Sequence, residues 1–425
     1  MEWLVVGYWT LSALAIGAAA LLALQTFEHR RFVRSRTASY QAHPVAPPGR
    51  IALVTACKGA DADLEANLRP LFEQDYEDYE LIFSVESHDD AACQTIQKLI
   101  LRYPGRQVRL VVAGRATSSG QKVHNLLAAT ERLPSDIRVV AFLDADARPP
   151  RDWLRLLTQR LNDHDAATGY RYFVPKRPSL ANFILASIDG AVVPIMFPGL
   201  HHKVWGGSWA IRRDAFEAVK LREAWQGTIS DDLVAANVLA RLRTRLAVEP
   251  ASILPSPLDV DMSGMFEFVR RQFMVGRYYS PVLWCGALVW NGIAQGVFWG
   301  SLAATAEGVL SRASWAWQPA SVVGVLYALH LVRAWLRREA SRAFLPGAQQ
   351  QLAAARRFDI WLGPVAALAG CLAMIGSAFG RRIVWRRIAY DMRFGGGVRK
   401  ITFLPDRSPF KPLAAEEIVR RKEAA

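Results

Sequence analysis

The hydrophobic positions of the 425-residue chain gather in long runs on either side of one segment of mixed composition. The first run, residues 5–24, has the length of one bilayer span. Three more runs lie late in the chain, at residues 282–310, 315–336 and 360–379. Residues 48–262 have the composition of a soluble domain. The pattern predicts a membrane protein that carries one inserted globular domain.

The charge around the first run indicates a retained anchor, residues 1–27, rather than a cleaved signal peptide. No positive residue precedes the run, whereas four arginines follow it within residues 30–36. Signal peptides have the opposite polarity. Because basic residues collect on the cytoplasmic side, we expect a bacterial inner-membrane protein whose inserted domain lies in the cytosol.

The late runs leave one conflict in the topology. If residues 282–380 cross the membrane three times from the cytosol, the tail, residues 381–425, ends outside. Yet the tail begins with four arginines within residues 381–387, which the charge rule places in the cytosol. Two explanations stay open: residues 360–379 form a re-entrant or surface-lying segment, broken near Pro364 or Gly370, or the count of spans is wrong.

The segment between the runs alternates strand-like and helix-like stretches. The strand candidates are residues 51–57, 80–85, 108–113 and 138–143, and the helix candidates that follow them are residues 61–68, 91–103, 121–131 and 153–161. This alternation predicts an α/β domain with a mostly parallel sheet covered by helices on both faces. No Gly-x-Gly-x-x-Gly follows the first strand and no Gly-Lys-Ser/Thr occurs, so dinucleotide and P-loop sites are not indicated.

Two carboxylates, Asp144 and Asp146, directly follow the fourth strand candidate. At positions i and i+2 of a strand both side chains point the same way, and open α/β sheets bind ligands at the carboxyl ends of their strands. Carboxylate oxygens suit Mg²⁺ or Mn²⁺, which would hold a diphosphate. A bare Asp-x-Asp is equally typical of an acidic turn.

Further polar clusters fall on what should be the same edge of the sheet, at residues 84–90, 114–126, 205–208 and 228–233. In order and spacing this set resembles that of the family-2-type inverting glycosyltransferases with a GT-A fold, and within them the ceramide glucosyltransferase-like group. The resemblance covers residues 48–282 and the tail motif Ile383-Val384-Trp385-Arg386.

The resemblance implies contacts with a nucleotide-sugar donor. Acids after the second strand help to hold the base and ribose, which matches Glu86, Asp89 or Asp90 here, and Lys122 matches a lysine near the donor's phosphates. Taken alone, Asp89-Asp90 is also typical of a helix N-cap, and Lys122 of a solvated lysine at a helix start.

The same resemblance assigns Asp144 and Asp146 to metal and nucleotide-sugar binding, and Asp232 to the catalytic base, with Asp231 beside it. A cation between the first pair and the diphosphate would neutralise the leaving group. Inverting transfer needs one carboxylate to take the proton of the attacking hydroxyl. Alternatively, or in addition, Asp231 and Asp232 cap the helix at residues 233–242.

One motif of that family, Gln or Arg separated by two residues from Arg-Trp, is altered here. Arg277-Tyr278 stands for Arg-Trp, but Met274 then occupies the Gln/Arg position, and Arg271 and Gln272 are out of register. Arg277 would pair with the diphosphate in bidentate fashion. The alternative is that residues 263–281 form a basic interfacial helix that contacts lipid headgroups.

The net charge of +14 gathers beside the apolar runs, at residues 270–271, 333–338, 356–357 and 381–387. Such clusters bind anionic lipid headgroups or reflect the positive-inside bias. Because no nucleic-acid motif accompanies the charge, we expect no nucleic-acid partner. The four cysteines have neither paired nor metal-ligand spacing, so no disulfide framework is predicted.

These observations lead us to expect an enzyme that moves a hexose or N-acetylhexosamine from a UDP-sugar to the hydroxyl of a membrane lipid, with Mg²⁺ or Mn²⁺ as cofactor. One alternative is a processive membrane polysaccharide synthase, which the altered Arg277 motif disfavours. The other is a membrane scaffold that kept the fold without the activity.

Overall fold

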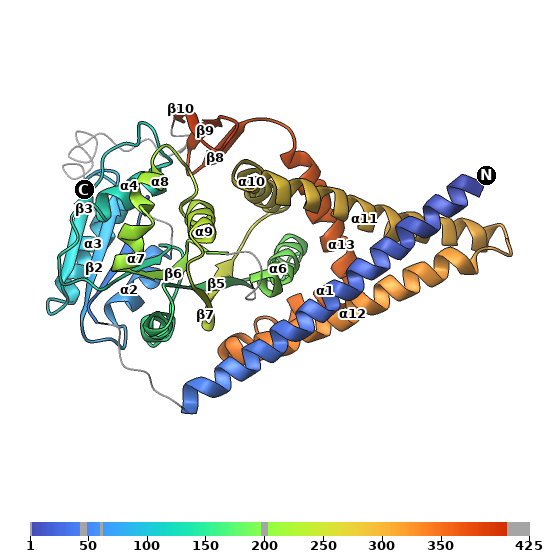
Figure 1. Cartoon of the computed structure of the whole chain (residues 1–425), viewed down its shortest axis with the longest axis horizontal. Coiled ribbons are helices and arrows are strands. Elements are labelled where there is room, and N and C mark those ends of the chain that lie inside the picture. The colour runs from blue at the N-terminus through green and yellow to red at the C-terminus, as the bar shows by residue number, and fades with distance from the viewer. Residues whose placement is uncertain (1, 43–48, 60–62, 197–202, 406–425) are drawn as a thin grey trace, which may run out of the picture.

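Seven strands form the central sheet of the computed structural model, which describes residues 2–42, 49–59, 63–196 and 203–405 (Figure 1). The strand order is β3-β2-β1-β4-β6-β5-β7. The four strands predicted from the sequence are confirmed and pair in parallel; they are β1 (Ile51–Ala56), β2 (Tyr79–Val85), β3 (Val108–Val112) and β4 (Val139–Leu143). The sheet continues through three strands that the sequence did not reveal, namely β5 (Ala166–Pro175), β6 (Ser208–Arg212) and β7 (Leu246–Leu258).

The sheet is mostly parallel, as predicted. The exception is β6, which runs antiparallel to both of its neighbours, β4 and β5, whereas β5 and β7 pair in parallel. The carboxyl end of β4 therefore lies beside the start of β6, where Leu143 pairs with Ser208. This reversal brings the loop that precedes β6 to the edge of the sheet where Asp144 follows β4.

Helices cover both faces of the sheet, because successive apolar side chains of β1 point to opposite faces and each face must be buried. Leu53 packs into a core with α2 (Leu64–Phe72), α3 (Ala91–Arg102) and α5 (Trp153–Thr158), whereas Val54 packs on the opposite face. The helices on that face are α4 (Gln121–Ala129), α7 (Arg213–Ala218), α8 (Leu221–Trp225) and α9 (Asp231–Arg241). Because successive side chains of a strand point to opposite faces, a strand buried on both sides is apolar throughout.

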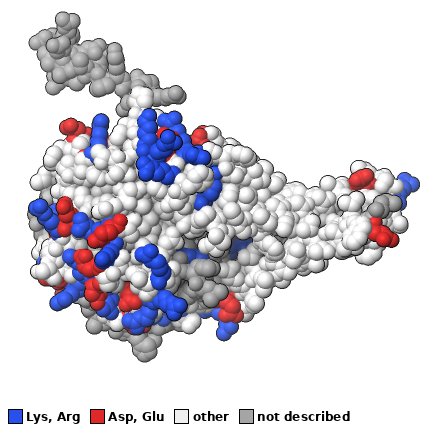
Figure 2. Space-filling view, turned by 45° about the horizontal axis from the view of Figure 1, so that its top comes forward, with Lys and Arg blue, Asp and Glu red and all other residues white. Residues whose placement is uncertain are grey.

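Three long helices project from the domain as an arm (Figure 1). They are α1 (Glu2–Ala42), α11 (Pro281–Leu310) and α12 (Trp317–Phe344), and each is long and apolar enough to span a bilayer. Figure 2 shows that charged side chains gather on the domain, whereas the arm is nearly free of them up to its tip. The arm is therefore the part of the molecule suited to the hydrocarbon of a membrane.

A fourth apolar helix, α13 (Ala353–Ser377), is arranged differently. It is one continuous helix through Pro364, so the break expected near that residue is wrong. It packs against α6 (Leu180–Val192) and α10 (Met262–Tyr279). Near its start Phe358 lies in a buried cluster with Phe173 of β5, and at its end Arg270 of α10 donates to the carbonyl of Gly376. Both ends of α13 thus contact the same domain.

The basic tail folds back onto that domain. Residues 382–403 form an antiparallel sheet of β8 (Arg382–Trp385), β9 (Ile388–Met392) and β10 (Val398–Phe403); residues 406–425 lie outside the described part of the chain. The hydroxyl of Tyr390 accepts a hydrogen bond of 3.1 Å from the backbone N–H of Gln121 at the start of α4. The N–H of Val398 donates to the carbonyl of Gly227. The described tail therefore lies on the catalytic-domain side, where the charge rule places it.

Candidate active site

The acids predicted from distant stretches of the chain line one cavity. Asp144 and Asp146 lie in the loop after β4, and Asp231 and Asp232 begin α9. All four line a cavity of about 400 Å³ that extends from the sheet edge toward α6 and α10. The convergence follows from topology, because the loop before β6 runs between the end of β4 and the start of α9.

Lys122 connects the two pairs of acids from the first turn of α4. Its Nζ lies 2.7 Å from Oδ1 of Asp144 and 3.0 Å from Oδ1 of Asp231. Burial opposes the charged ammonium, but Asp144, Asp231 and Asp232 outweigh this effect and raise the pKa of Lys122. The lysine is therefore a fixed cation among carboxylates, and the interpretation of a solvated helix-start lysine is wrong.

Asp231 is buried, and only glycine fits beside it. A Cβ on Gly206 would lie 2.5 Å from Oδ2 of Asp231, an oxygen that has no hydrogen-bond partner among the described residues. Burial raises the pKa of Asp231 to about 6, with the lysine partly offsetting the increase and Asp232 adding to it. Asp231 is thus held close to the surrounding backbone and is screened from solvent.

Asp232 is more open than its neighbour and is held by three donors. Its Oδ1 accepts from the hydroxyl of Ser230 at 2.6 Å and from the N–H of Leu233 at 2.7 Å, and its Oδ2 accepts from the N–H of Gly206 at 3.3 Å. The N-cap of α9 is Ser230, not either aspartate. The alternative that Asp231 or Asp232 is the N-cap of this helix is therefore wrong, because Ser230 occupies that position. The carboxylate of Asp232 lines the cavity.

Asp144 and Asp146 present oxygens without a full set of protein partners. Asp146 makes no hydrogen bond or ion pair with the described residues and its side chain is open to the cavity. Desolvation by the surrounding protein and then the charge of Asp144 nevertheless raise its pKa. An excess of hard carboxylate oxygens at one point fits a divalent cation bound together with a phosphate group. No cluster of three or more His, Cys, Asp or Glu ligands exists among the described residues, so the remaining ligands would come from the nucleotide or water.

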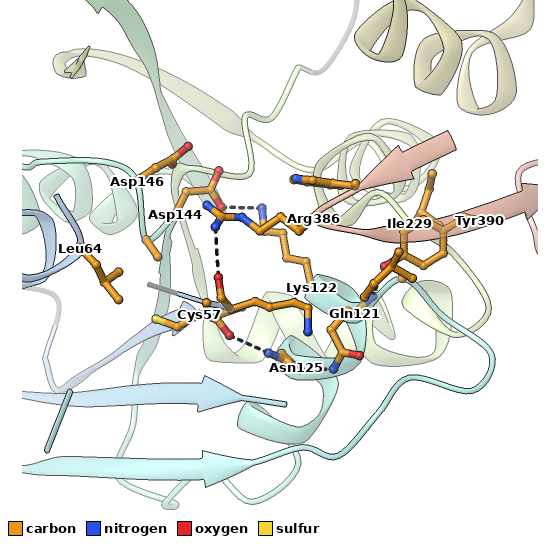
Figure 3. A pocket seen from close by; sticks show the side chains of 17 residues that line it. Cys57, Leu64, Gln121, Lys122, Asn125, Asp144, Asp146, Ile229, Arg386 and Tyr390 are labelled. Carbon is orange, nitrogen blue, oxygen red and sulfur yellow. Dashed lines mark hydrogen bonds and ion pairs between the residues drawn. The ribbon is translucent and has the colours of Figure 1, made fainter. Parts of the chain in front are cut away.

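A second cavity adjoins the acids on the side of the tail (Figure 3). Lys122, Asp144 and Asp146 line it together with Asn125, whose amide donates to the carbonyls of Cys57 and Ser84. These contacts tie the ends of β1 and β2 to α4. Both cavities have mixed polar and apolar linings and share the Asp-x-Asp loop. Helices α6 and α10 contribute an apolar wall to the first, whereas residues of the tail line the second, which we call the tail-side cavity.

The tail supplies residues to the tail-side cavity that sequence reasoning did not include in the site. Trp385, Arg386 and Tyr390 all line it. Arg386 and its neighbour Arg387 adopt positive φ values of 44° and 64°, as a two-residue hairpin turn between β8 and β9 requires. The turn directs Arg386 across the cavity mouth to donate to the carbonyl of Lys58. The tail motif in the sequence was the signal that could have revealed them.

The acids after β2 have separate environments. Glu86 is buried and pairs with Lys58, which lines the tail-side cavity, and with Arg115 at 3.2 Å. Asp90 caps α3, since its Oδ1 accepts from the N–H of Ala92, and it also accepts from Gly59. Asp89 is exposed and lines neither cavity. The N-cap interpretation is therefore confirmed for Asp90. Glu86 contacts the cavity wall through Lys58 and Asp90 contacts it through Gly59, whereas Asp89 does not line it.

Arg277 does not reach the acids. Its guanidinium donates to the carbonyls of Ala378 and Gly380, so it fastens α10 to the segment after α13, and it lines neither cavity. Arg271, which is out of register in the sequence motif, lines the larger cavity instead. The structure therefore does not place Arg277 where a diphosphate contact requires it.

The apolar wall of the larger cavity is built from the helices nearest the arm. Leu185, Ile188 and Val192 of α6 and Phe268 and Phe273 of α10 line it. Asp189 of α6 is buried there, accepting from the N–H of Phe173 and the hydroxyl of Tyr170. Burial, partly offset by Arg171, raises the pKa of Asp189 to about 6. A cavity with carboxylates at one end and an apolar wall at the other suits a ligand with an apolar body and a polar tip.

Comparison with known proteins agrees with this architecture. The model of glycosyl transferase family 21 matches residues 9–398. Ceramide glucosyltransferases 1 and 3 of Caenorhabditis elegans are each 29% identical, over 91 and 82 residues. The matched stretches cover 20% and 19% of this chain and only 19% and 18% of those enzymes. A mannosyltransferase of Pyrobaculum calidifontis, solved with GDP-Man and Mn²⁺, covers 87% of this chain and 97% of its own at 18% identity and a TM-score of 0.44.

The family match extends from the first apolar helix into the tail sheet, so it includes the catalytic domain, the arm and the Trp385-Arg386 turn. The matched residues also contain the Asp-x-Asp loop after β4 and the two acids at the start of α9. The chain belongs to glycosyl transferase family 21.

Proposed function

We propose that the protein transfers a hexose or N-acetylhexosamine from a UDP-sugar to the hydroxyl of a membrane lipid, with inversion at the anomeric carbon. The observation that carries the proposal is the continuity of the site. The tail-side cavity and the larger cavity, which has an apolar wall from α6 and α10, meet at Lys122, Asp144 and Asp146. Donor and acceptor can therefore approach the same acids from opposite sides.

Asp232 is the general base of this proposal. Its two oxygens accept from Ser230, Leu233 and Gly206, which fixes the carboxylate without supplying a positive partner. An acceptor hydroxyl placed in the larger cavity would give its proton to Asp232 as its oxygen attacks the anomeric carbon. Asp231 is unsuited to this role because it is buried and paired with Lys122.

Asp144 and Asp146 would hold Mg²⁺ or Mn²⁺ together with the diphosphate, and the cation would supply charge neutralisation for the departing UDP. Lys122 keeps Asp144 oriented and adds a second positive charge at the same edge. Trp385 and Arg386 of the tail line the tail-side cavity, where the nucleotide would bind. Glu86, through Lys58, supports the wall where the base and ribose would lie.

A lipid acceptor is supported by the placement of the apolar wall and by the names of the relatives. The wall belongs to α6 and α10, which pack against α13 beside the membrane arm, so a lipid would enter sideways from the bilayer. The similar Caenorhabditis elegans proteins are ceramide glucosyltransferases. We place the domain in the cytosol because UDP-sugars are made there and because four arginines follow the apolar run of α1, within residues 30–36 of the helix.

The test is to incubate membranes containing the protein with a panel of labelled UDP-sugars and to analyse the labelled product by mass spectrometry. A labelled lipid bearing a single sugar, absent with Asp232→Asn, is the expected result. A labelled polymer would identify a polysaccharide synthase instead. Absence of both transfer and UDP release with every donor would overturn the proposal in favour of a scaffold.

A further inference from the structure

Four arginines surround a hollow where the membrane arm joins the domain. Arg338 and Arg342 come from the end of α12, and Arg356 and Arg357 from the first turns of α13. The chain turns between them through residues 345–352, so two basic clusters that are separate in the sequence lie together. The hollow has a volume of about 680 Å³, and no acidic side chain is among the residues that line it. We call it the arginine hollow.

The arginines of this hollow are only partly neutralised. Arg342 pairs with Glu339, while Arg356 donates to Oε1 of Gln349 and to the hydroxyl of Ser341, both at 2.6 Å. Within residues 203–405, neither Arg338 nor Arg357 has a hydrogen bond or ion pair through its side chain. Glu339 also pairs with a second arginine, since its Oε2 lies 3.8 Å from Nη2 of Arg34 in α1. Four like charges beside a single, shared carboxylate favour the binding of an anion.

The length of α12 places the hollow at a membrane interface. Trp317, the first residue of α12, is exposed near the tip of the arm, and Arg338 follows 21 positions later. At 1.5 Å per residue the two are about 31 Å apart along the helix, close to the thickness of the hydrocarbon of a bilayer. Exposed Trp335 and Trp361 flank the hollow on α12 and α13. Tryptophan is enriched at the level of lipid headgroups.

A strip of exposed apolar side chains leads away from the hollow along α13. It begins one turn after Arg357 and consists of Trp361, Leu362, Val365, Leu372 and Ile375, and Phe379 continues it just beyond the end of the helix. The opposite face of α13 packs on α6 and α10, and both helix ends contact the domain. Although α13 is as apolar as the arm helices and also contacts α11 and α12, both of its ends contact the domain, so in this proposal it lies at the interface with one face toward the acyl chains. This orientation also keeps the tail on the side of the catalytic domain.

We propose that the arginine hollow binds the phosphate of an anionic phospholipid from the leaflet facing the catalytic domain, with the acyl chains along the exposed strip of α13. The phosphodiester would accept hydrogen bonds from Arg338 and Arg357, whose donors are otherwise unused. The bound lipid would hold α13, and through it α6 and α10, at a fixed depth in the interface. The site is separate from the sugar-transfer cavities, so the proposal does not rest on the proposed function.

The test compares lipid retention by the full-length protein in native mass spectrometry. The probes are phosphatidylglycerol and phosphatidylcholine with identical acyl chains. The variant replaces Arg338, Arg342 and Arg357 by Gln; Arg356 is kept because its hydrogen bonds join α13 to α12. The control variant replaces Arg132, Arg241 and Arg243 by Gln, which removes the same charge from exposed positions of the catalytic domain.

The wild-type protein and the control are expected to retain phosphatidylglycerol in preference to phosphatidylcholine. The hollow variant is expected to bind phosphatidylglycerol at least about tenfold more weakly, because the arginines act near an anionic headgroup. Equal retention of both lipids by the wild type, or undiminished phosphatidylglycerol binding by the hollow variant, would overturn the proposal. Displacement of the lipid by millimolar inorganic phosphate would also overturn it, since the hollow would then be a site for free phosphate.

Discussion

Lys122 lies 2.7 Å from Asp144, so a lysine from the first turn of α4 is in direct contact with the Asp-x-Asp loop after β4. The same ammonium reaches Asp231 at 3.0 Å, which joins α4, β4 and α9 through one side chain. A cation shared by two carboxylates fixes their separation before any ligand arrives.

We predict that Lys122→Met destabilises the protein by about 3 kcal/mol and abolishes transfer, because it leaves Asp231 buried without its positive partner. Thermal unfolding followed by tryptophan fluorescence measures the first effect, and product formation the second. Lys98→Met, on the exposed face of α3, is the control and should change neither. A stable, active Lys122→Met protein would show that the ammonium is dispensable.

Asp232→Asn is expected to reduce the rate of transfer by roughly 10³-fold while leaving the affinity for UDP nearly unchanged. The amide keeps the acceptor oxygen for Leu233 but cannot take a proton. Single-turnover rates and donor affinity by calorimetry separate the two effects. A parallel loss of donor affinity would argue that Asp232 binds the donor and that the base lies elsewhere.

Asp144→Ala and Asp146→Ala are each expected to remove the dependence of UDP binding on Mn²⁺ or Mg²⁺. The reason is that these two carboxylates are the acids shared by both cavities. Calorimetric titration of UDP with metal and with chelator measures the difference. Asp89→Ala should retain metal-dependent binding, because Asp89 is exposed and outside the cavities. Unchanged metal dependence in both loop variants would place the cation elsewhere.

Arg386→Ala is expected to weaken UDP binding about tenfold or more, whereas Arg277→Ala should leave it unchanged. A hydrogen bond to a charged group contributes about 1.5–3 kcal/mol. Of these two arginines, only Arg386 lines the tail-side cavity, where we propose that the nucleotide binds. Arg277 instead donates to Ala378 and Gly380, so its loss should lower the unfolding temperature. The reverse result, with Arg277 controlling the affinity, would restore the assignment made from the sequence motif.

The buried carboxyl of Asp189 should make stability depend on pH. Burial raises its pKa from 3.8 to about 6, so between about pH 4 and 6 the folded protein keeps a proton that the unfolded chain has lost. The free energy of unfolding therefore falls by up to about 3 kcal/mol as pH rises through this window. Above the window the contribution of Asp189 no longer changes with pH.

Asp189→Asn should remove that dependence while still accepting from the N–H of Phe173. The measurement is the difference in unfolding temperature between wild type and variant at both ends of the window. The unfolding temperature of the variant should rise relative to that of the wild type as pH rises. A constant difference would mean that Asp189 titrates near its ordinary value in the folded protein.

The sequence by itself determined the first four strands, the helices between them and the Asp-x-Asp pair at a strand end. These follow from local pattern, since a strand buried on both faces must be apolar until it ends at the sheet edge. It also located the apolar helices, because crossing hydrocarbon demands length and composition alone. The long strand β5, with Tyr170 and Arg171 among its residues, is too mixed in composition to be recognised in this way.

Only the tertiary structure decided which side chains meet at the acids. Arg271 and Arg277 lie on the same helix, but six residues turn a helix by about 600°, so the two point roughly 120° apart. Packing of α10 against α13 directs Arg271 to the cavity and Arg277 to the carbonyls after α13. Arg386 reaches the nucleotide side because the tail sheet folds back across a separation of more than 200 residues. Such long-range contacts depend on the whole fold and leave no periodicity in the local sequence.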